Sequence, residues 1–586
     1  MHPWVAKLRS LATKQPALFA FVSGYALVQL ATGGWDLPSS FSWENDGIAP
    51  REMFADVASA FTTGQASRYP LLHQLLLVLL CVPITLPAAI AAGSFTPPEL
   101  LANVMTVPLM TACTVVAKLV SIAMACASLV VLAKLCERIF GAGVGCLAAM
   151  FAATNLTVSY YGRTVNLDGP YLFWTTLAAH ELLGVLDGHV RSYRKFAVFA
   201  AASVATKDQA YASYVLPISA VAIVVSLGCR GVLPRGRGHW RALVDGSVWG
   251  TLSYLGLSGV LFNPTGFVAR VAELTGSASA HWRGYTRDPQ GVLANLQDIV
   301  GAQDEYFWPW PFVIAAWLGV LIACVPKRGD DPAMSALVRR MLPLSFGCSS
   351  LVCFALVVGR SQHRFVLPMG FFLAPYVAYA ISLATQFIRS RSLRRSVVVS
   401  LLGWSAWNDV QLRLTQLGDA RHELERELAT LSERATVETY GPLVYLPRFD
   451  RLGRDDLVFQ RVGTEPTLRR NPIRGMHELQ APFEALEQRR PDVMVLTESF
   501  INRFEAPTPS PGRVSSEFAR GARSDAETTK LFARAREGRL TGYHLHRTFE
   551  TNLPNWAVAL GARPHHVHGS TGMRVWMLVR ITTTHE

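Results

Sequence analysis

The stretch YYGRTVNLDGPYLFW, residues 160–174, joins two apolar runs, 143–161 and 169–187, and carries Arg163 and Asp168 at their junction. A membrane span needs roughly 20 apolar residues, and both runs come close to that length. A charged side chain at the centre of a membrane helix costs about 2.5–3.5 kcal/mol on insertion scales. The stretch is therefore interpreted as a connection at one face of a membrane, between two spans.

The whole chain is too apolar for an ordinary soluble protein of its size. Of its 586 residues, 50% are hydrophobic and 17% are charged, and the mean hydropathy is +0.25. Apolar runs recur through residues 1–408, and the first of them, 17–34, lacks a clear small-residue cleavage site and is expected to be an anchor. We expect a transmembrane module at 1–408, a linker helix at 409–435 and a soluble α/β domain at 436–586.

Basic residues gather in short segments between the apolar runs, as cytoplasmic loops do. The six clusters are Lys7/Arg9/Lys14, Lys134/Arg138, Arg191/Arg194/Lys195, Arg230/Arg235/Arg237/Arg241, Lys327/Arg328/Arg339/Arg340 and Arg389/Arg391/Arg394/Arg395. These clusters account for the net charge of +13 without a nucleic-acid partner. Placing them all inside, with the N-terminus, puts residues 160–174, Lys207, loop 263–307, the Arg360–Arg364 turn and the C-terminal domain outside.

The span count depends on the first two basic clusters, because three apolar stretches separate them where only an even number of crossings fits. The middle stretch, 71–92, contains Pro83 and Pro87, and proline breaks or kinks the interior of a helix. This stretch is therefore expected to be re-entrant or to lie along the outer face. The prediction is a polytopic α-helical protein with about eleven spans plus membrane-surface helices.

The ionisable residues of the membrane half mostly fall on the external face, which predicts a functional site there. They are Glu44, Asp46, Arg68, His73, Arg163, Asp168, Lys207, Asp208, Arg360, His363 and Arg364. A carboxylate such as Asp46 can act as general base towards a hydroxyl or amine, and Lys207 and Arg364 can hold a phosphate. A base beside a phosphate clamp suits group transfer from a lipid phosphate, because the cations stabilise the leaving group.

Five stretches, in their order along the chain, resemble a known family. They are WENDG (43–47), RYPLLHQLLL (68–77), YGRTVNLDGPYLFW (161–174), ATKDQAY (205–211) and HRFVLP (363–368). The layout over about residues 15–390 resembles the polytopic GT-C glycosyltransferases, in particular glycosyltransferase family 39, with its protein O-mannosyltransferase and lipid A aminoarabinose transferase relatives. It departs from the family at Asn45-Asp46, where the family has Asp-Glu, and at Tyr69-Pro70, where it has His-Pro-Pro.

The resemblance implies an inverting glycosyltransferase that uses a polyprenyl-phosphate sugar donor. The implied acceptor is a lipid, a glycan or a protein, and the implied location is a bacterial inner membrane with the C-terminal domain in the periplasm. The competing interpretation is a transporter or flippase of a lipid-linked sugar. No internal repeat of the kind found in transporters is visible in the sequence.

The resemblance also implies roles for individual residues. Asp46 would be the catalytic base, with Glu44 as the neighbouring candidate, and Lys207 and Arg364 would bind the lipid phosphate. Arg163 and Asp168 would form an ion pair or a hydrogen-bond network that shapes the cavity, although helix capping alone would also explain Asp168. The other expected donor-binding residues are Arg68, Tyr69 and His73.

The long external loop is a candidate acceptor or gating loop through His281, Trp282 and Tyr285, which would equally suit an interfacial aromatic belt. No cofactor is required for the expected reaction. The run HHVH (565–568) has no acidic partner or paired cysteines beside it, so no metal ligand is assigned, and a divalent metal stays open.

Overall fold

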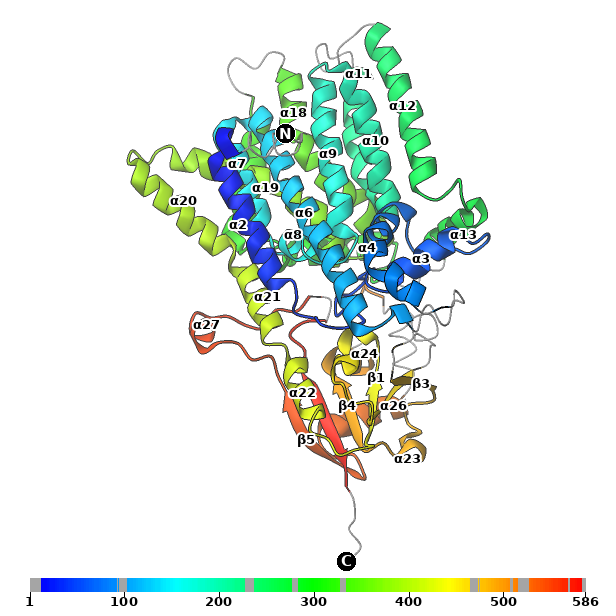
Figure 1. Cartoon of the computed structure of the whole chain (residues 1–586). Coiled ribbons are helices and arrows are strands. Elements are labelled where there is room, and N and C mark those ends of the chain that lie inside the picture. The colour runs from blue at the N-terminus through cyan, green and yellow to red at the C-terminus, as the bar shows by residue number, and fades with distance from the viewer. Residues whose placement is uncertain are drawn as a thin grey trace, which may run out of the picture.

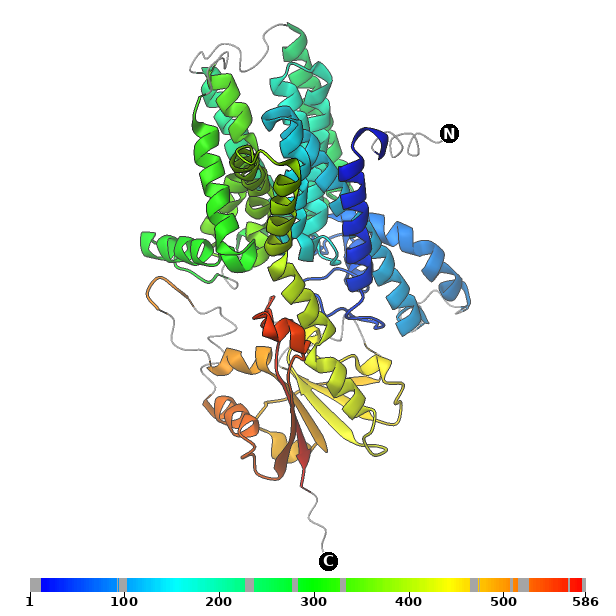
Figure 2. The ribbon, with the colours of Figure 1, turned by 90° about the vertical axis from the view of Figure 1, so that its left-hand side faces the viewer.

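The computed structural model consists of a bundle of helices and, at one end of it, a domain built around a β-sheet (Figure 1). It describes residues 12–91, 93, 103–226, 237–276, 283–326, 333–463, 473, 475–505, 510–514, 526–567 and 570–581. The view at right angles shows the same two parts, with the C-terminus at the far end of the sheet domain (Figure 2).

The helical part is formed by segments that are mostly apolar. They are α2 (Pro16–Thr32), α3 (Glu52–Ala60), α4 (Leu71–Ala91), α6 (Val107–Phe140), α7 (Ala142–Thr154), α8 (Leu156–Tyr161), α9 (Asp168–Leu186), α10 (Val190–Thr206), the 3-10 helix η1 (Asp208–Tyr214), α11 (Val215–Ser226), α12 (Arg237–Leu257), α13 (Pro264–Thr275), α15 (Pro289–Gly301), α16 (Gln303–Tyr306), α17 (Trp310–Cys324), α18 (Ala333–Ser350), the π-helix η2 (Leu351–Leu356), α19 (His363–Thr385) and α20 (Arg391–Ser405).

Within the described residues, four helical segments are long and apolar enough to cross a membrane, namely α4, α6, Met334–Leu356 and α19. Three shorter helices, α2, α7 and α17, are also apolar. These segments agree with the expected membrane protein. The count of about eleven spans stays a prediction.

Helix α4 corrects one expectation. It runs without a break from Leu71 to Ala91, with Pro83 and Pro87 inside it. Prolines are tolerated in membrane helices where neighbouring groups satisfy the freed backbone atoms. The prediction that these prolines interrupt the helix is therefore wrong, and α4 is itself among the segments able to span.

Helix α19 forms the centre of the bundle. Of the most apolar 18 residues in α19, 83% are buried inside the structure, whereas 22% are buried in the corresponding stretch of α4. Helices α7, α17 and α18 pack around it. Because α19 begins at His363, its first turn places Arg364 at the end of the bundle that faces the sheet domain.

The predicted run 143–161 is two helices rather than one. Asn155 separates α7 from α8, and its side-chain oxygen accepts a hydrogen bond from the backbone N–H of Val158 at 3.2 Å. An asparagine in this position caps the start of a helix. The chain then turns through residues 162–167 into α9, and this turn is buried beneath the first loop and α21 (Trp407–Leu417).

The linker is also two helices. Helix α21 ends at Leu417 and is followed by Gly418. Helix α22 (Ala420–Leu428) begins after Asp419, whose side chain accepts a hydrogen bond from the backbone N–H of Arg421 at 3.0 Å. A Cβ at Gly418 would lie 1.9 Å from the carbonyl oxygen of Asn552. The close contact between these two backbones ends the predicted continuous helix of 409–435.

The C-terminal domain has the expected α/β character. Its sheet has the order β3-β2-β1-β4-β6-β5, in which the first four strands are parallel and the last two are antiparallel to their neighbours. The strands are β1 (Thr436–Tyr440), β2 (Val458–Gly463), β3 (Met476–Gln480), β4 (Val493–Thr497), β5 (Tyr543–Phe549) and β6 (Val575–Arg580), and the helices are η3 (Leu443–Tyr445), η4 (Phe449–Arg451), α23 (Leu486–Arg489), α24 (Glu498–Glu505), α26 (Ala526–Arg536) and α27 (Asn555–Ala559).

The loop between α2 and α3, residues 33–51, joins the two parts. Trp35, Phe41 and Trp43 belong to the same buried apolar cluster as the strands of the sheet domain. Ile48 and Ala49, a few residues later, pack with α4 and α6 in the helical part. Asp46 lies between these two groups, at the boundary of the bundle and the sheet domain.

Candidate functional site

A cavity of about 2190 Å³ lies between the helical bundle and the sheet domain. The bundle contributes the loop 41–52, residues 66–69, the start of η1, part of α13 and the turn before α19. The sheet domain contributes the carboxyl ends of its parallel strands, at Gly441, Gly463 and Gln480. In open sheets of this kind the carboxyl ends of parallel strands commonly line ligand sites.

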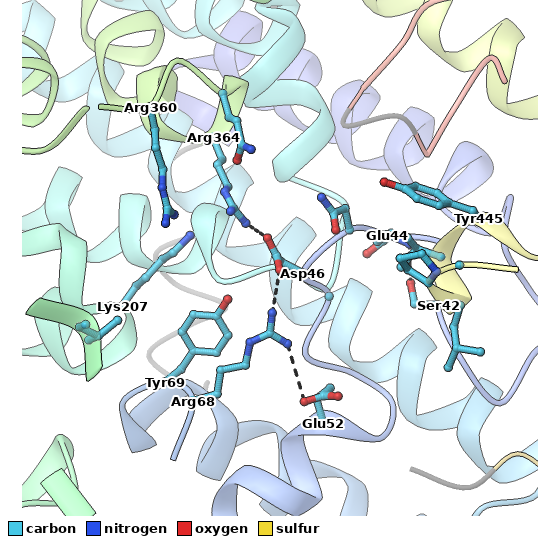
Figure 3. A pocket seen from close by; sticks show the side chains of 18 of the residues that line it. Ser42, Glu44, Asp46, Glu52, Arg68, Tyr69, Lys207, Arg360, Arg364 and Tyr445 are labelled. Carbon is cyan, nitrogen blue, oxygen red and sulfur yellow. Dashed lines mark hydrogen bonds and ion pairs between the residues drawn. The ribbon is translucent and has the colours of Figure 1, made fainter. Parts of the chain in front are cut away.

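Asp46 is held in the cavity wall by its backbone and by two arginines (Figure 3). Its φ is +57°, a left-handed conformation, and the following Gly47 N–H donates to the carbonyl of Glu44 at 3.1 Å. One carboxylate oxygen of Asp46 lies 2.8 Å from Nη2 of Arg68, and the other pairs with Arg364. The tight turn thus presents the carboxylate to cations from two other segments.

Lys207 and Arg360 approach the same place from other elements (Figure 3). Lys207 follows the end of α10, and its Nζ lies 2.6 Å from Oδ1 of Asp168, where burial lowers its pKa against the opposing effect of Asp168. Burial likewise lowers the pKa of Arg360 to about 10. At that value the guanidinium of Arg360 is still charged at neutral pH.

The cavity therefore collects more cations than a single carboxylate needs. Arg68, Lys207 and the pair Arg360 and Arg364 come together from three segments far apart in the sequence. Their carboxylate neighbours are Asp46, Asp168 and Glu52, the last at 3.8 Å from Arg68. A cluster of buried and half-buried cations of this kind favours an anionic ligand.

Glu44, the second carboxylate of the first loop, is already engaged. Its Oε1 lies 2.9 Å from Nζ of Lys118, and its Oε2 accepts a hydrogen bond from the backbone N–H of Val165 at 2.5 Å. Burial raises the pKa of Glu44, and Lys118 opposes that shift. Glu44 is only 2% exposed, so we assign it to holding the loop, and Asp46 is the better candidate base.

The expected pairing of Arg163 with Asp168 is wrong. Arg163 is buried away from the cavity lining, where it donates to Oε1 of Gln416 at 2.7 Å and lies 3.5 Å from Asp409 of α21. Asp168 pairs with Lys207 instead. Capping does not explain Asp168 either, since the residue at the cap of α9 is Leu167, with no side-chain hydrogen bond.

The remaining predicted residues divide into three groups. Arg68 and Tyr69 line the cavity together, with the guanidinium carbon 5.4 Å from the centre of the ring. His73 is buried in α4 and is not part of the lining. His281 and Trp282 lie outside the described residues.

Tyr285, the described member of the external loop, braces the turn that carries Arg360. Its hydroxyl donates to Asp298 and lies 2.9 Å from the hydroxyl of Ser361. The neighbouring backbone is bonded to the sheet domain, since Thr286 N–H donates to the carbonyl of Gly512 at 2.9 Å. This part of the loop therefore connects the turn before α19 to the sheet domain, while Tyr285 itself is not among the residues that line the cavity.

Cavity residues that come from the sheet domain and from α13 are not among those predicted from the sequence. Tyr445, Arg461 and Arg503 belong to the sheet domain, where Arg503 donates to the hydroxyl of Tyr445 at 2.8 Å. Arg270 of α13 is buried 3.5 Å from Asp208. These residues carry no local motif, and only the docking of one part of the chain on the other brings them to the site.

Within the described part of the chain, no group of three or more His, Cys, Asp or Glu side chains is arranged to hold a metal ion. The HHVH run ends at His568, which lies outside the described residues.

Searches for related proteins found no matching family model and no matching curated protein. Among solved structures, the chain is similar to ArnT from Cupriavidus metallidurans bound to undecaprenyl phosphate, with a TM-score of 0.44 and 13% identity, covering 96% of this chain and 98% of that chain. It is also similar to the oligosaccharyltransferase AglB from Archaeoglobus fulgidus in complex with an inhibitory peptide and a dolichol-phosphate, with a TM-score of 0.38 and 11% identity, covering 97% and 89%.

The identities and TM-scores are low. The function proposed below therefore rests on the residues of the cavity.

Proposed function

We propose that this protein is a glycosyltransferase that moves a sugar from a polyprenyl-phosphate donor to an acceptor at the outer face of the membrane. The observation that carries the proposal is the cluster in the cavity wall, where Asp46 lies between Arg68 and Arg364 with Lys207 and Arg360 beside them. A cationic clamp around one carboxylate is the combination that transfer from a lipid phosphate requires.

Asp46 and the donor phosphate compete for the same cations in this proposal. A phosphate that enters the cavity takes over the guanidinium of Arg364, because phosphate accepts more hydrogen bonds from arginine than a single carboxylate oxygen does. The carboxylate of Asp46 is then released as a base. The site is thereby set to become basic only when the donor is bound.

In the transfer step, an acceptor oxygen or nitrogen attacks the anomeric carbon of the sugar, and the bond from that carbon to the phosphate oxygen breaks. Asp46 takes the proton of the acceptor. The phosphate leaves with the bonding electrons, and Arg364, Lys207 and Arg360 stabilise its charge. Attack opposite to the leaving phosphate inverts the anomeric configuration.

The orientation that fits this proposal has the N-terminus in the cytoplasm and the cavity and the sheet domain on the outer side of a bacterial inner membrane, with the spans within 1–408 and the soluble domain over 436–586. The basic clusters described above support it. The acceptor would be a lipid, glycan or protein reaching the cavity from that side.

Asp46→Asn tests the proposal most directly. The purified protein in nanodiscs is incubated with a panel of radiolabelled polyprenyl-phosphate monosaccharides and with membrane lipid, glycan and peptide acceptors. We expect transfer by the wild type and a loss of about 100-fold or more in the variant, the range for removing a general base, with donor binding retained. Lys530→Met, an exposed change in the sheet domain, is the control and should transfer normally.

Equal transfer by wild type and Asp46→Asn would remove Asp46 from the mechanism. If no donor is turned over while labelled lipid crosses the membrane of sealed vesicles, the protein is a transporter or flippase and the proposal is wrong.

A further inference from the structure

The loop that carries Asp46 is fastened on two sides. On the side of the bundle, Lys118 of α6 binds both Asp36, at 2.6 Å, and Glu44, at 2.9 Å. Glu44 also accepts the backbone N–H of Val165, as described above. These bonds fix both ends of the segment from Asp36 to Glu44 to α6, and they fix Glu44 also to the turn before α9.

On the other side, the sheet domain holds the loop through Trp43. This indole is fully buried, with Cζ of Arg421 3.7 Å and Cζ of Arg448 4.6 Å from its ring centre. Its N–H donates to the carbonyl of Leu446 at 2.8 Å. A guanidinium over a tryptophan face is a favourable contact, and more so where water is excluded.

The two arginines are themselves fixed within the linker and the sheet domain. Arg421 pairs with Asp419 at 2.7 Å and Arg448 pairs with Glu425 at 2.6 Å. Arg448 also donates to the carbonyl of Leu37 at 2.7 Å, so it touches the loop at a second point. The clamp around Trp43 is therefore rigid, and its rigidity is supplied by residues outside the bundle.

Asp46 needs such support because its backbone conformation is unfavourable for a residue with a side chain. A left-handed φ at a non-glycine residue persists where the surrounding structure over-determines it. Trp43 lies three residues before Asp46 in the same turn-rich segment. Because only two residues separate them, a rotation of Trp43 would therefore also displace the carboxylate of Asp46.

We infer that the C-terminal domain positions the catalytic loop, and that Trp43, clamped between Arg421 and Arg448, is the positioning residue through which it acts on Asp46. This role rests on the proposed function. Under it, the sheet domain contributes to catalysis by positioning the loop, without a catalytic motif of its own. Small displacements of a catalytic group are sufficient, since a shift of about 1 Å can lower a rate roughly 100-fold.

The first arm of the test does not depend on turnover. Hydrogen exchange of the full-length protein in nanodiscs is compared for the wild type, Trp43→Ala, Trp43→Phe and the double variant Arg448→Met/Glu425→Gln, which leaves no carboxylate unpaired. We expect backbone amides of residues 36–51 to exchange about tenfold faster or more in Trp43→Ala and in the double variant. Arg539→Met, an exposed change in the same domain, should leave them unchanged.

The second arm measures transfer with the donor found above. For Trp43→Ala we expect kcat to fall by roughly 10- to 100-fold. The donor KM should stay the same or fall, because a displaced Asp46 competes less with the phosphate for Arg364. Trp43→Phe keeps an aromatic face for the two guanidiniums and should recover most of that kcat. A general loss of fold would instead lower the amount of folded enzyme and would not be rescued by Phe.

Unchanged exchange over residues 36–51 in Trp43→Ala and in the double variant would overturn the inference, as would faster exchange with an unchanged kcat in an active enzyme. A fall in kcat in the Arg539→Met control equal to that in Trp43→Ala would also overturn it. If the wild type turns over no donor, the proposed function and the catalytic role fail together. The exchange arm then still decides whether the sheet domain holds the loop.

Discussion

The carboxylate of Asp46 lies between two guanidinium groups, and these ion pairs engage both of its oxygens before a donor arrives. Lys207 is held in an ion pair as well. Among the described residues, Asp168 is the only carboxylate within salt-bridge distance of this buried ammonium group. At the scale of single residues, the charge of the site depends on a small number of ionisable side chains. Removing one of these charges should therefore change the pH dependence of transfer.

Asp168→Asn should shift that pH dependence. Asp168 favours the charged form of Lys207, while burial disfavours it and lowers its pKa. Removing the carboxylate lowers the pKa of Lys207 further, so its charge is lost at a lower pH. The alkaline fall in donor affinity should therefore move to lower pH, measured as donor KM against pH.

Asp187→Asn, at the opposite end of α9, is the matched control for this change and should keep the wild-type profile. A variant of Asp168 whose alkaline limb coincides with that of the wild type would show that Lys207 does not bind the donor.

At the scale of elements, the close approach of α17 and α19 fixes the central helix and with it the position of Arg364. Gly319 of α17 faces the backbone of α19, where a Cβ would lie 2.1 Å from the carbonyl oxygen of Tyr376. Small residues allow membrane helices to approach this closely. Both helices lie within apolar runs of the sequence, which gives no sign of which glycine lies at the contact, because that depends on which helix packs against which.

Gly319→Ala should therefore destabilise the protein by about 1–3 kcal/mol, the range for overpacking a tight interface. The measurement is thermal unfolding in detergent or nanodiscs, followed by the loss of helical circular dichroism. Gly24→Ala in α2, where the added Cβ meets nothing within 4 Å, is the control and should leave the unfolding temperature nearly unchanged. Equal unfolding temperatures for both variants would show that α17 and α19 are not in such close contact.

At the scale of the whole molecule, the cavity exists because a sheet domain docks on one end of a helical bundle (Figure 2). The arrangement makes a prediction about topology. If the basic loops are cytoplasmic, the sheet domain and the cavity must both be accessible from the outer side.

Cysteines introduced at Glu550 in the sheet domain and at Lys195, in the basic cluster near the start of α10, test this topology in intact cells. A membrane-impermeant maleimide should label Glu550→Cys directly, and should label Lys195→Cys only after the membrane is permeabilised. The wild-type chain, whose own cysteines all lie at or before residue 353, provides the background signal. The reverse pattern of labelling would place the cavity in the cytoplasm.

The sequence by itself determined the division of this protein into an apolar helical part and a polar α/β domain, because hydrophobicity and periodicity are local properties of a chain. It also identified Asp46, Lys207 and Arg364 as candidates, since ionisable residues beside apolar runs are conspicuous. Only the tertiary structure decided their partners. Asp168 meets Lys207 rather than Arg163, and Trp43 lies between Arg421 and Arg448, because such contacts are set by the packing of elements that lie 39 to hundreds of residues apart in the sequence.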